Sequence, residues 1–224
     1  MSLSAQIERL LGVLGERWPA TLECFRPGLS EGEIHDLIDQ YFPALGHDLP
    51  QDFVTWWSYQ DGYDKDRVTR ARAAGHTVAD SWEPTTGGRF SSLSSHLYLR
   101  QVASDEAEER EWADSDATWP TYPIAETLGG GTYGLWRRTP EDIVRIWFRD
   151  KVEGWETVPQ NPRNESQTPT FIDWLTALND AVQAERLILT SSEARFGSIK
   201  RARPTPLGVQ DGYPWPRTQT LEPE

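Results

Sequence analysis

Residues 30–62 constrain the fold of this chain more than any other stretch, because they carry the start and stop signals of two short helices. Ser30 and Glu33 have the S-x-x-E spacing in which each side chain satisfies a backbone amide at the helix start. The apolar residues that follow recur with a helical period and form a single stripe: Ile34, Leu37, Ile38, Tyr41 and Phe42. The sequence therefore predicts a capped amphipathic helix that begins at Ser30.

A second, aromatic helix is predicted after a Leu-Pro turn. Pro50 has the fixed φ and the missing N–H that suit a first helical position. Its apolar stripe consists of Phe53, Trp56 and Trp57. Gly62 stands where a left-handed residue is expected to close the helix.

The remaining patterns predict an α+β domain. A first helix is expected over about residues 4–18, and Pro19 ends it. Three β-branched or aromatic runs separated by glycine and proline are predicted strands, and a fourth run is a candidate: 121–125, 134–136, 143–148 and 152–158. Strands this close in sequence usually pair as antiparallel hairpins. A last helix is predicted to open at Thr168-Pro169, so an antiparallel β-sheet meander is flanked by N-terminal helices and a C-terminal helix.

Other stretches lack such clear signals for the start and end of helices and strands. Residues 64–88 are polar without a period and are expected to form a long loop, whereas the glutamate-rich residues 97–112 predict a solvated helix. The tail beyond Leu189 contains five prolines, together with Tyr213 and Trp215, which favour docking onto the domain over full solvation. The predicted organisation is an amphipathic helix at 1–19, an α+β domain at 20–189 and a Pro-rich extension at 190–224.

The motifs of residues 30–62 also resemble the opening of the SUKH superfamily, whose members include a yeast regulator of cell-wall synthesis. The shared pattern is an acidic capped helix, then Leu-Pro-x-Asp-Phe, then an aromatic helix that ends in a turn, here Leu49–Phe53, Trp56-Trp57 and Asp61-Gly62. Later motifs follow in the family's order: Tyr122–Ala125, Gly129–Gly131, Ile143–Trp147 and the helix that begins just before Phe171. The resemblance covers roughly residues 20–185 and implies a SUKH-like α+β fold. The length of the polar stretch at 63–90 and the tail depart from the pattern.

Charge narrows the classes of partner. The 224 residues include 22 Lys and Arg against 35 Asp and Glu, which gives a net charge of −13. An acidic surface repels phosphate backbones, so we expect no nucleic-acid binding and favour a basic protein partner, although solubility alone also explains acidic proteins. Charged residues interrupt the N-terminal apolar run, unlike a signal peptide, and no apolar run approaches the ~20 residues of a membrane span. A soluble cytoplasmic protein without membrane contact is expected.

No motif predicts a catalytic or metal centre. Gly129, Gly131 and Gly134 match G-x-G-x-x-G, but a predicted strand follows them where a dinucleotide site needs a helix. The four histidines are dispersed and lack the i, i+4 spacing of helical metal ligands. Cys24 is the single cysteine and is expected to be a buried, inert thiol. We therefore expect no catalytic residue, no cofactor and no metal.

Three functions remain open. In bacteria, SUKH domains are similar to immunity proteins, which bind and neutralise a cognate polymorphic toxin, so the resemblance implies a non-catalytic protein-binding domain with a basic toxin domain as its partner. The eukaryotic relatives imply instead an intracellular regulatory scaffold, and an unrecognised hydrolase or small-ligand binder is the third alternative. Predicted loop position, charge and aromatic character select the candidate contact residues: Asp61, Tyr63, Asp64, Asp66, Trp82 and Glu83.

Overall fold

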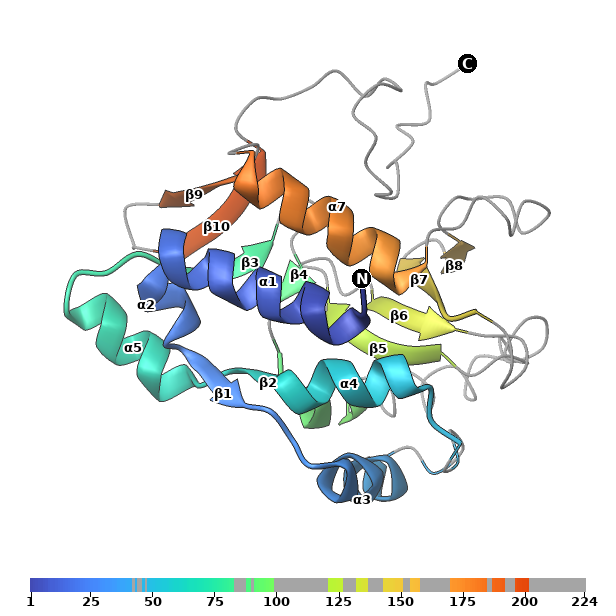
Figure 1. The fold of residues 1–224 in the computed structure, drawn as a ribbon. Helices are drawn as coiled ribbons and strands as arrows, with labels where there is room; N and C mark the ends of the chain where they lie inside the picture. Colours follow the sequence, from blue (N-terminus) through green and yellow to red (C-terminus); the bar gives the residue numbers. More distant parts are fainter. Residues whose placement is uncertain are drawn as a thin grey trace, which may run out of the picture.

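The protein is a mixed α and β structure in which helices cover a twisted sheet (Figure 1). The computed structural model describes these residues: 1–41, 43, 46, 48–82, 88–89, 91–98, 121–126, 132–136, 143–150, 154–157, 170–184, 187–191 and 196–201. The described helices include α1 (Leu3–Arg17), α2 (Pro19–Leu22), α3 (Glu31–Tyr41), α4 (Gln51–Tyr59), α5 (Lys65–Ala73) and α7 (Phe171–Gln183), and residues 93–98 are helical as well. Among the described residues, no helix has both the length and the apolar character that a bilayer crossing requires.

The described residues form two sheets. The small one pairs β1 (Phe25–Pro27) with β2 (Gln60–Tyr63) antiparallel. The strands of the large sheet are β3 (Val78–Trp82), β4 (Gly88–Arg89), β5 (Thr121–Glu126), β6 (Thr132–Trp136), β7 (Arg145–Asp150), β8 (Gly154–Thr157), β9 (Leu187–Ser191) and β10 (Phe196–Arg201). Their order is β8-β7-β6-β5-β4-β3-β10-β9, and neighbours from β3 to β8 are all antiparallel.

The α+β prediction and the meander are confirmed, and the candidate strand at 152–158 is β8. The sheet is mixed, however, because β10 pairs parallel with β3 and antiparallel with β9. The predicted domain boundary at residue 189 falls inside β9, so the sheet extends into the segment assigned to the tail and α7 is not the last element. Tyr213 and Trp215 lie outside the described residues, as does most of the predicted helix at 97–112.

The long loop predicted for residues 64–88 is wrong, since this stretch contains α5, β3 and β4. Asp64 caps α5 by accepting hydrogen bonds from the backbone amides of Asp66 (2.9 Å) and Arg67 (3.0 Å). Val68 is the buried residue of α5, so the helix has almost no apolar stripe for a periodicity search to find.

The predicted helix signals of residues 30–62 are largely confirmed. Ser30 and Glu33 form the capping box: the Glu33 carboxylate accepts from the Ser30 amide (2.8 Å) and hydroxyl (2.7 Å), and Ser30 Oγ accepts from the Glu33 amide (3.3 Å). Pro50 lies one residue before α4 rather than inside it. Gly62 has φ of +68°, as expected for a left-handed residue, but it belongs to β2 and not to the helix end.

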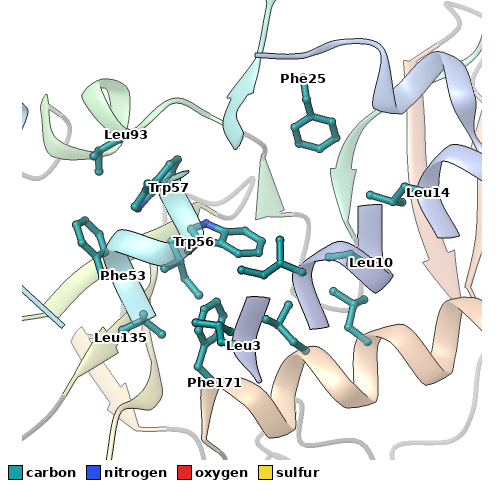
Figure 2. Close-up of a cluster of buried hydrophobic side chains, with 14 of the residues drawn as sticks. Leu3, Leu10, Leu14, Phe25, Phe53, Trp56, Trp57, Leu93, Leu135 and Phe171 are labelled. Carbon is teal, nitrogen blue, oxygen red and sulfur yellow. The ribbon is translucent and has the colours of Figure 1, made fainter. Parts of the chain in front are cut away.

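The core lies between the helices and the large sheet, with α4 at its centre (Figure 2). Phe53 contacts the Tyr122 ring at 5.5 Å between centroids, and Trp56 meets Phe171 edge-on at 5.6 Å. The Trp57 indole N–H donates to the Pro123 carbonyl of β5 at 3.2 Å, which ties α4 to the sheet. The pairing of α1 with α7 (Figure 1) includes a buried polar contact, in which the Asn179 amide donates to the Gln6 backbone and side-chain oxygens.

Candidate functional site

The strongest charge asymmetry of the described structure lies in residues 27–64, here called the acidic segment. It contains eight carboxylates and no Lys or Arg: Glu31, Glu33, Asp36, Asp39, Asp48, Asp52, Asp61 and Asp64. The first five of these residues are exposed. Four of the exposed carboxylates lie on α3, which projects away from the sheet (Figure 1).

Local packing fixes the orientation of α3. Ile34 and Ile38 are fully buried one turn apart, so the opposite face of the helix must point to solvent. That face carries Asp36, with Glu33 and Asp39 on either side of it. Hydrogen bonds from Ser30 lower the pKa of the Glu33 carboxyl, which keeps it ionised at neutral pH. The capped helix therefore holds several negative charges in a fixed array.

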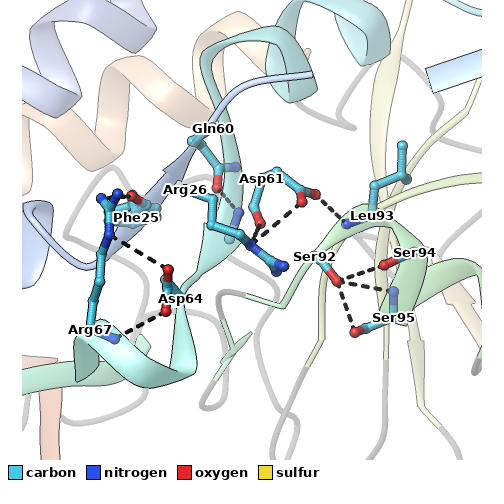
Figure 3. Close-up of polar contacts among 11 residues, drawn as sticks. Phe25, Arg26, Gln60, Asp61, Asp64, Arg67, Ser92, Leu93, Ser94 and Ser95 are labelled. Carbon is cyan, nitrogen blue, oxygen red and sulfur yellow. Dashed lines mark hydrogen bonds and ion pairs between the residues drawn. The ribbon is translucent and has the colours of Figure 1, made fainter. Parts of the chain in front are cut away.

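Two of the six predicted contact residues are buried in the structure. Asp61 and Tyr63 each retain 9% of their surface exposed. The Asp61 carboxylate accepts a hydrogen bond from the Leu93 amide at 2.8 Å (Figure 3), which caps the helical turns of residues 93–98. Arg26 donates from Nε to the Asp61 carbonyl (3.0 Å), and its Nε lies 3.6 Å from the Asp61 carboxylate.

Burial raises the pKa of the Asp61 carboxyl, and the Leu93 amide and the Arg26 guanidinium oppose that rise. Asp61 joins β2 to β1 and to residues 93–98, through the contacts of its carbonyl and carboxylate with Arg26 and of its carboxylate with the Leu93 amide. Among the described residues, these contacts connect segments of the fold and give Asp61 a structural role. The charge and loop position that marked it as a contact residue carry no information about burial.

The other predicted contact residues differ in their exposure. Asp64 is half-buried. Its carboxylate caps α5 and forms an ion pair with Arg67 at 3.5 Å (Figure 3). Its pKa is lowered, mainly by the hydrogen bond from the Arg67 amide. Asp66 is exposed on α5, next to the acidic segment. Trp82 lies in β3, whereas Glu83 falls outside the described residues.

The exposed carboxylates of α3 were missed as contact candidates. The available signal was the absence of Lys and Arg between Arg26 and Lys65, combined with the helical period that buries Ile34 and Ile38. Together these two patterns place charge on the outer face of α3. A search for loop residues excludes such positions, because they lie within a helix.

Two other reactive side chains, His96 and Cys24, are enclosed. His96 is fully buried beside the Trp57 ring, 5.6 Å away, and burial lowers its pKa to about 3, so the imidazole is neutral at physiological pH. Cys24 is buried, as predicted, and its thiol donates to the Ala20 carbonyl at 3.1 Å. Burial raises the pKa of this thiol, which disfavours the reactive thiolate.

Within the described residues, no group of three or more His, Cys, Asp or Glu side chains is arranged to hold a metal ion. Comparisons of the chain with protein-family models, with curated proteins and with solved structures found no match in any of the three.

Proposed function

We propose that this protein is a non-catalytic, cytoplasmic protein-binding domain whose acidic segment recognises a basic partner. The proposed partner is a bacterial toxin domain of the kind that SUKH-type immunity proteins neutralise. The observation that carries the proposal is the exposed array of carboxylates on α3, in a segment that contains no Lys or Arg.

An array of this kind suits recognition for two physical reasons. Because α3 is capped and anchored by Ile34 and Ile38, the backbone that carries its carboxylates needs little ordering when a partner binds. Because the charges are exposed, their attraction acts over about 10 Å at moderate ionic strength and accelerates the encounter with a positively charged surface. The net charge of −13 has the same sign and adds to this steering.

The family motifs support the choice of a toxin as the partner. They occur in the SUKH order from the capped helix at Ser30 to the helix that begins at Phe171, and both helices are present in the structure. Immunity proteins of this superfamily act by binding, and a toxin that cleaves nucleic acid has a basic surface that an acidic helix complements.

Co-purification with the product of a toxin gene adjacent to the gene for this protein tests the proposal. We expect a stable complex whose association slows as salt is added. If no product of a neighbouring gene binds, the immunity role is refuted. If a cell-wall synthesis component binds instead, the regulatory alternative replaces it.

A matched pair of charge reversals locates the interface. Asp36→Lys changes the exposed face of α3, whereas Glu16→Lys makes the same charge change on an exposed position of α1. Two units of charge at about 10 Å from a basic group in water correspond to roughly 0.8 kcal/mol, or a factor of about four in rate. We expect Asp36→Lys to slow association by about this factor at low salt, with little effect from Glu16→Lys. Equal effects would mean that only net charge matters and that α3 is not the contact.

A further inference from the structure

The tetrapeptide Gln-Asp-Gly-Tyr occurs twice in this chain, at residues 60–63 and 210–213. An Asp-Gly bond is chemically labile, because glycine has no side chain to shield its nitrogen and permits the backbone conformations that attack requires. The glycine nitrogen attacks the aspartyl side-chain carbonyl, a C–N bond forms and water leaves, which gives a five-membered succinimide. Water then opens this ring at either carbonyl, giving aspartate or β-linked isoaspartate with no net change in mass.

In the first copy, the structure holds both reacting groups away from this path. The Gly62 amide donates to the Gln60 side-chain oxygen at 2.6 Å, so the nucleophilic nitrogen is engaged. The Asp61 carboxylate is fixed by the Leu93 amide at 2.8 Å, and the Asp61 carbonyl accepts from Arg26 at 3.0 Å (Figure 3). Gln60 and Asp61 are both buried, which keeps water from the bond.

We propose that Asp61-Gly62 is a latent isomerisation site, and that Gln60, Arg26 and the Leu93 amide suppress its conversion to isoaspartate in the folded protein. Attack requires local opening that breaks these three hydrogen bonds. Each bond contributes a factor of about five, so the folded state slows the reaction roughly a hundredfold relative to the unfolded chain.

Conversion at this position would remove the contacts that make Asp61 structural. The β-linkage inserts one extra carbon into β2 and leaves the free carboxylate attached directly to the α-carbon. That carboxylate no longer reaches the Leu93 amide from the same backbone position, so residues 93–98 lose their cap. The site is therefore a point at which slow chemical ageing releases a helix from the core.

The second copy of the tetrapeptide supplies an internal reference for the test. The full chain is incubated in mildly acidic buffer, with and without concentrated urea, and isoaspartate is quantified at each site by peptide mapping with a protease that cleaves before Asp but not before isoaspartate. In urea, Asp61 and Asp211 have the same flanking Gln, Gly and Tyr, and we expect them to convert at the same rate. In native buffer, we expect conversion at Asp61 to fall roughly a hundredfold below its rate in urea. Comparable native and denatured rates at Asp61 would overturn the proposal.

Gln60→Ala tests the contact to the attacking nitrogen, and Gln210→Ala is the matched control. We expect Gln60→Ala to accelerate native conversion at Asp61 about fivefold, whereas Gln210→Ala leaves it unchanged. If Gln60→Ala keeps the wild-type circular dichroism spectrum and the Asp61 rate does not rise, Gln60 has no protective role. If this variant does not fold, the comparison of native and denatured wild type still decides the proposal.

Discussion

Gly28 lies where the chain after β1 passes so close to the end of α4 that no side chain fits, and its replacement by alanine should be severely destabilising. A Cβ atom at this position would lie 1.9 Å from the Ser58 carbonyl oxygen, 2.1 Å from its carbon and 2.7 Å from the Tyr59 nitrogen. All three neighbours are backbone atoms at the end of α4, so no side-chain rotation can relieve the contact. The φ angle of Gly28 is not in the left-handed region, so the cost arises from crowding and not from backbone conformation.

The size of the loss in unfolding free energy follows from how far the chain after β1 must move to admit the alanine side chain. Restoring a normal contact requires the chain after β1 to shift by about 1.5 Å from α4, at a cost of about 1–3 kcal/mol for overpacking. The same shift breaks the hydrogen bond from the Leu29 amide to the Trp57 carbonyl, 2.9 Å long, which adds about 1 kcal/mol. Gly28→Ala should therefore lower the free energy of unfolding by about 2–4 kcal/mol, a large part of the 5–15 kcal/mol typical of a domain.

Urea denaturation monitored by tryptophan fluorescence measures this change, and Gly12→Ala is the matched control. Gly12 lies on an exposed face in the interior of α1, and a Cβ there meets nothing within 4 Å. Alanine should stabilise α1 by roughly 0.5–1 kcal/mol, because it loses less conformational entropy than glycine in a helix. The two substitutions should thus have opposite signs. A Gly28→Ala variant as stable as the wild type would show that β1 and α4 do not approach as closely as described.

Three further predictions concern single contacts. Trp57→Phe should lower the free energy of unfolding in urea by about 1–3 kcal/mol more than Trp56→Phe does. The Trp57 indole N–H donates to the Pro123 carbonyl, whereas the buried Trp56 indole N–H has no partner among the described residues. Equal losses of unfolding free energy in the two variants would contradict this reasoning. Thr170→Ala should lower the thermal midpoint through a loss of about 1 kcal/mol, because Thr170 and Asp173 form the capping box of α7, and an unchanged midpoint would exclude that role. For Asp61, the folded pKa lies above the unfolded value, so its contribution to stability is largest when it is protonated and is lost as pH rises from about 3.8 through the folded pKa. Asp61→Asn keeps an acceptor for the Leu93 amide without the charge. The free energy of unfolding of this variant, relative to that of the wild type, should therefore increase over that pH window. If urea titrations at several pH values give a constant difference between the two proteins, the raised pKa of Asp61 is refuted.

Features that depend on neighbours in sequence were predictable. The capping box of Ser30 and Glu33 joins residues three apart, and the stripe that buries Ile34 and Ile38 follows from the helical period. The hairpins between β5 and β8 were also predictable from the sequence, because short loops favour antiparallel pairing of adjacent strands. Glycine at position 62 also permits the positive φ that the structure has there.

Only the tertiary structure decided which polar residues are buried and where the sheet ends. Asp61 looks like a solvated turn residue in sequence, but its partner Leu93 is 32 positions away, and no local pattern reports such a contact. The parallel pairing of β10 with β3 joins Phe196 to Val78, so the sheet continues into a segment that composition assigned to the tail. α5 was missed for a related reason, since the Asp64 cap and the Arg67 contacts with the Glu23 and Phe25 carbonyls replace the apolar stripe that sequence periodicity detects. Local hydrogen bonds and helical periodicity depend on residues that are close in sequence, so the sequence predicts them. Burial depends instead on which distant segments pack together, and only the tertiary structure shows that.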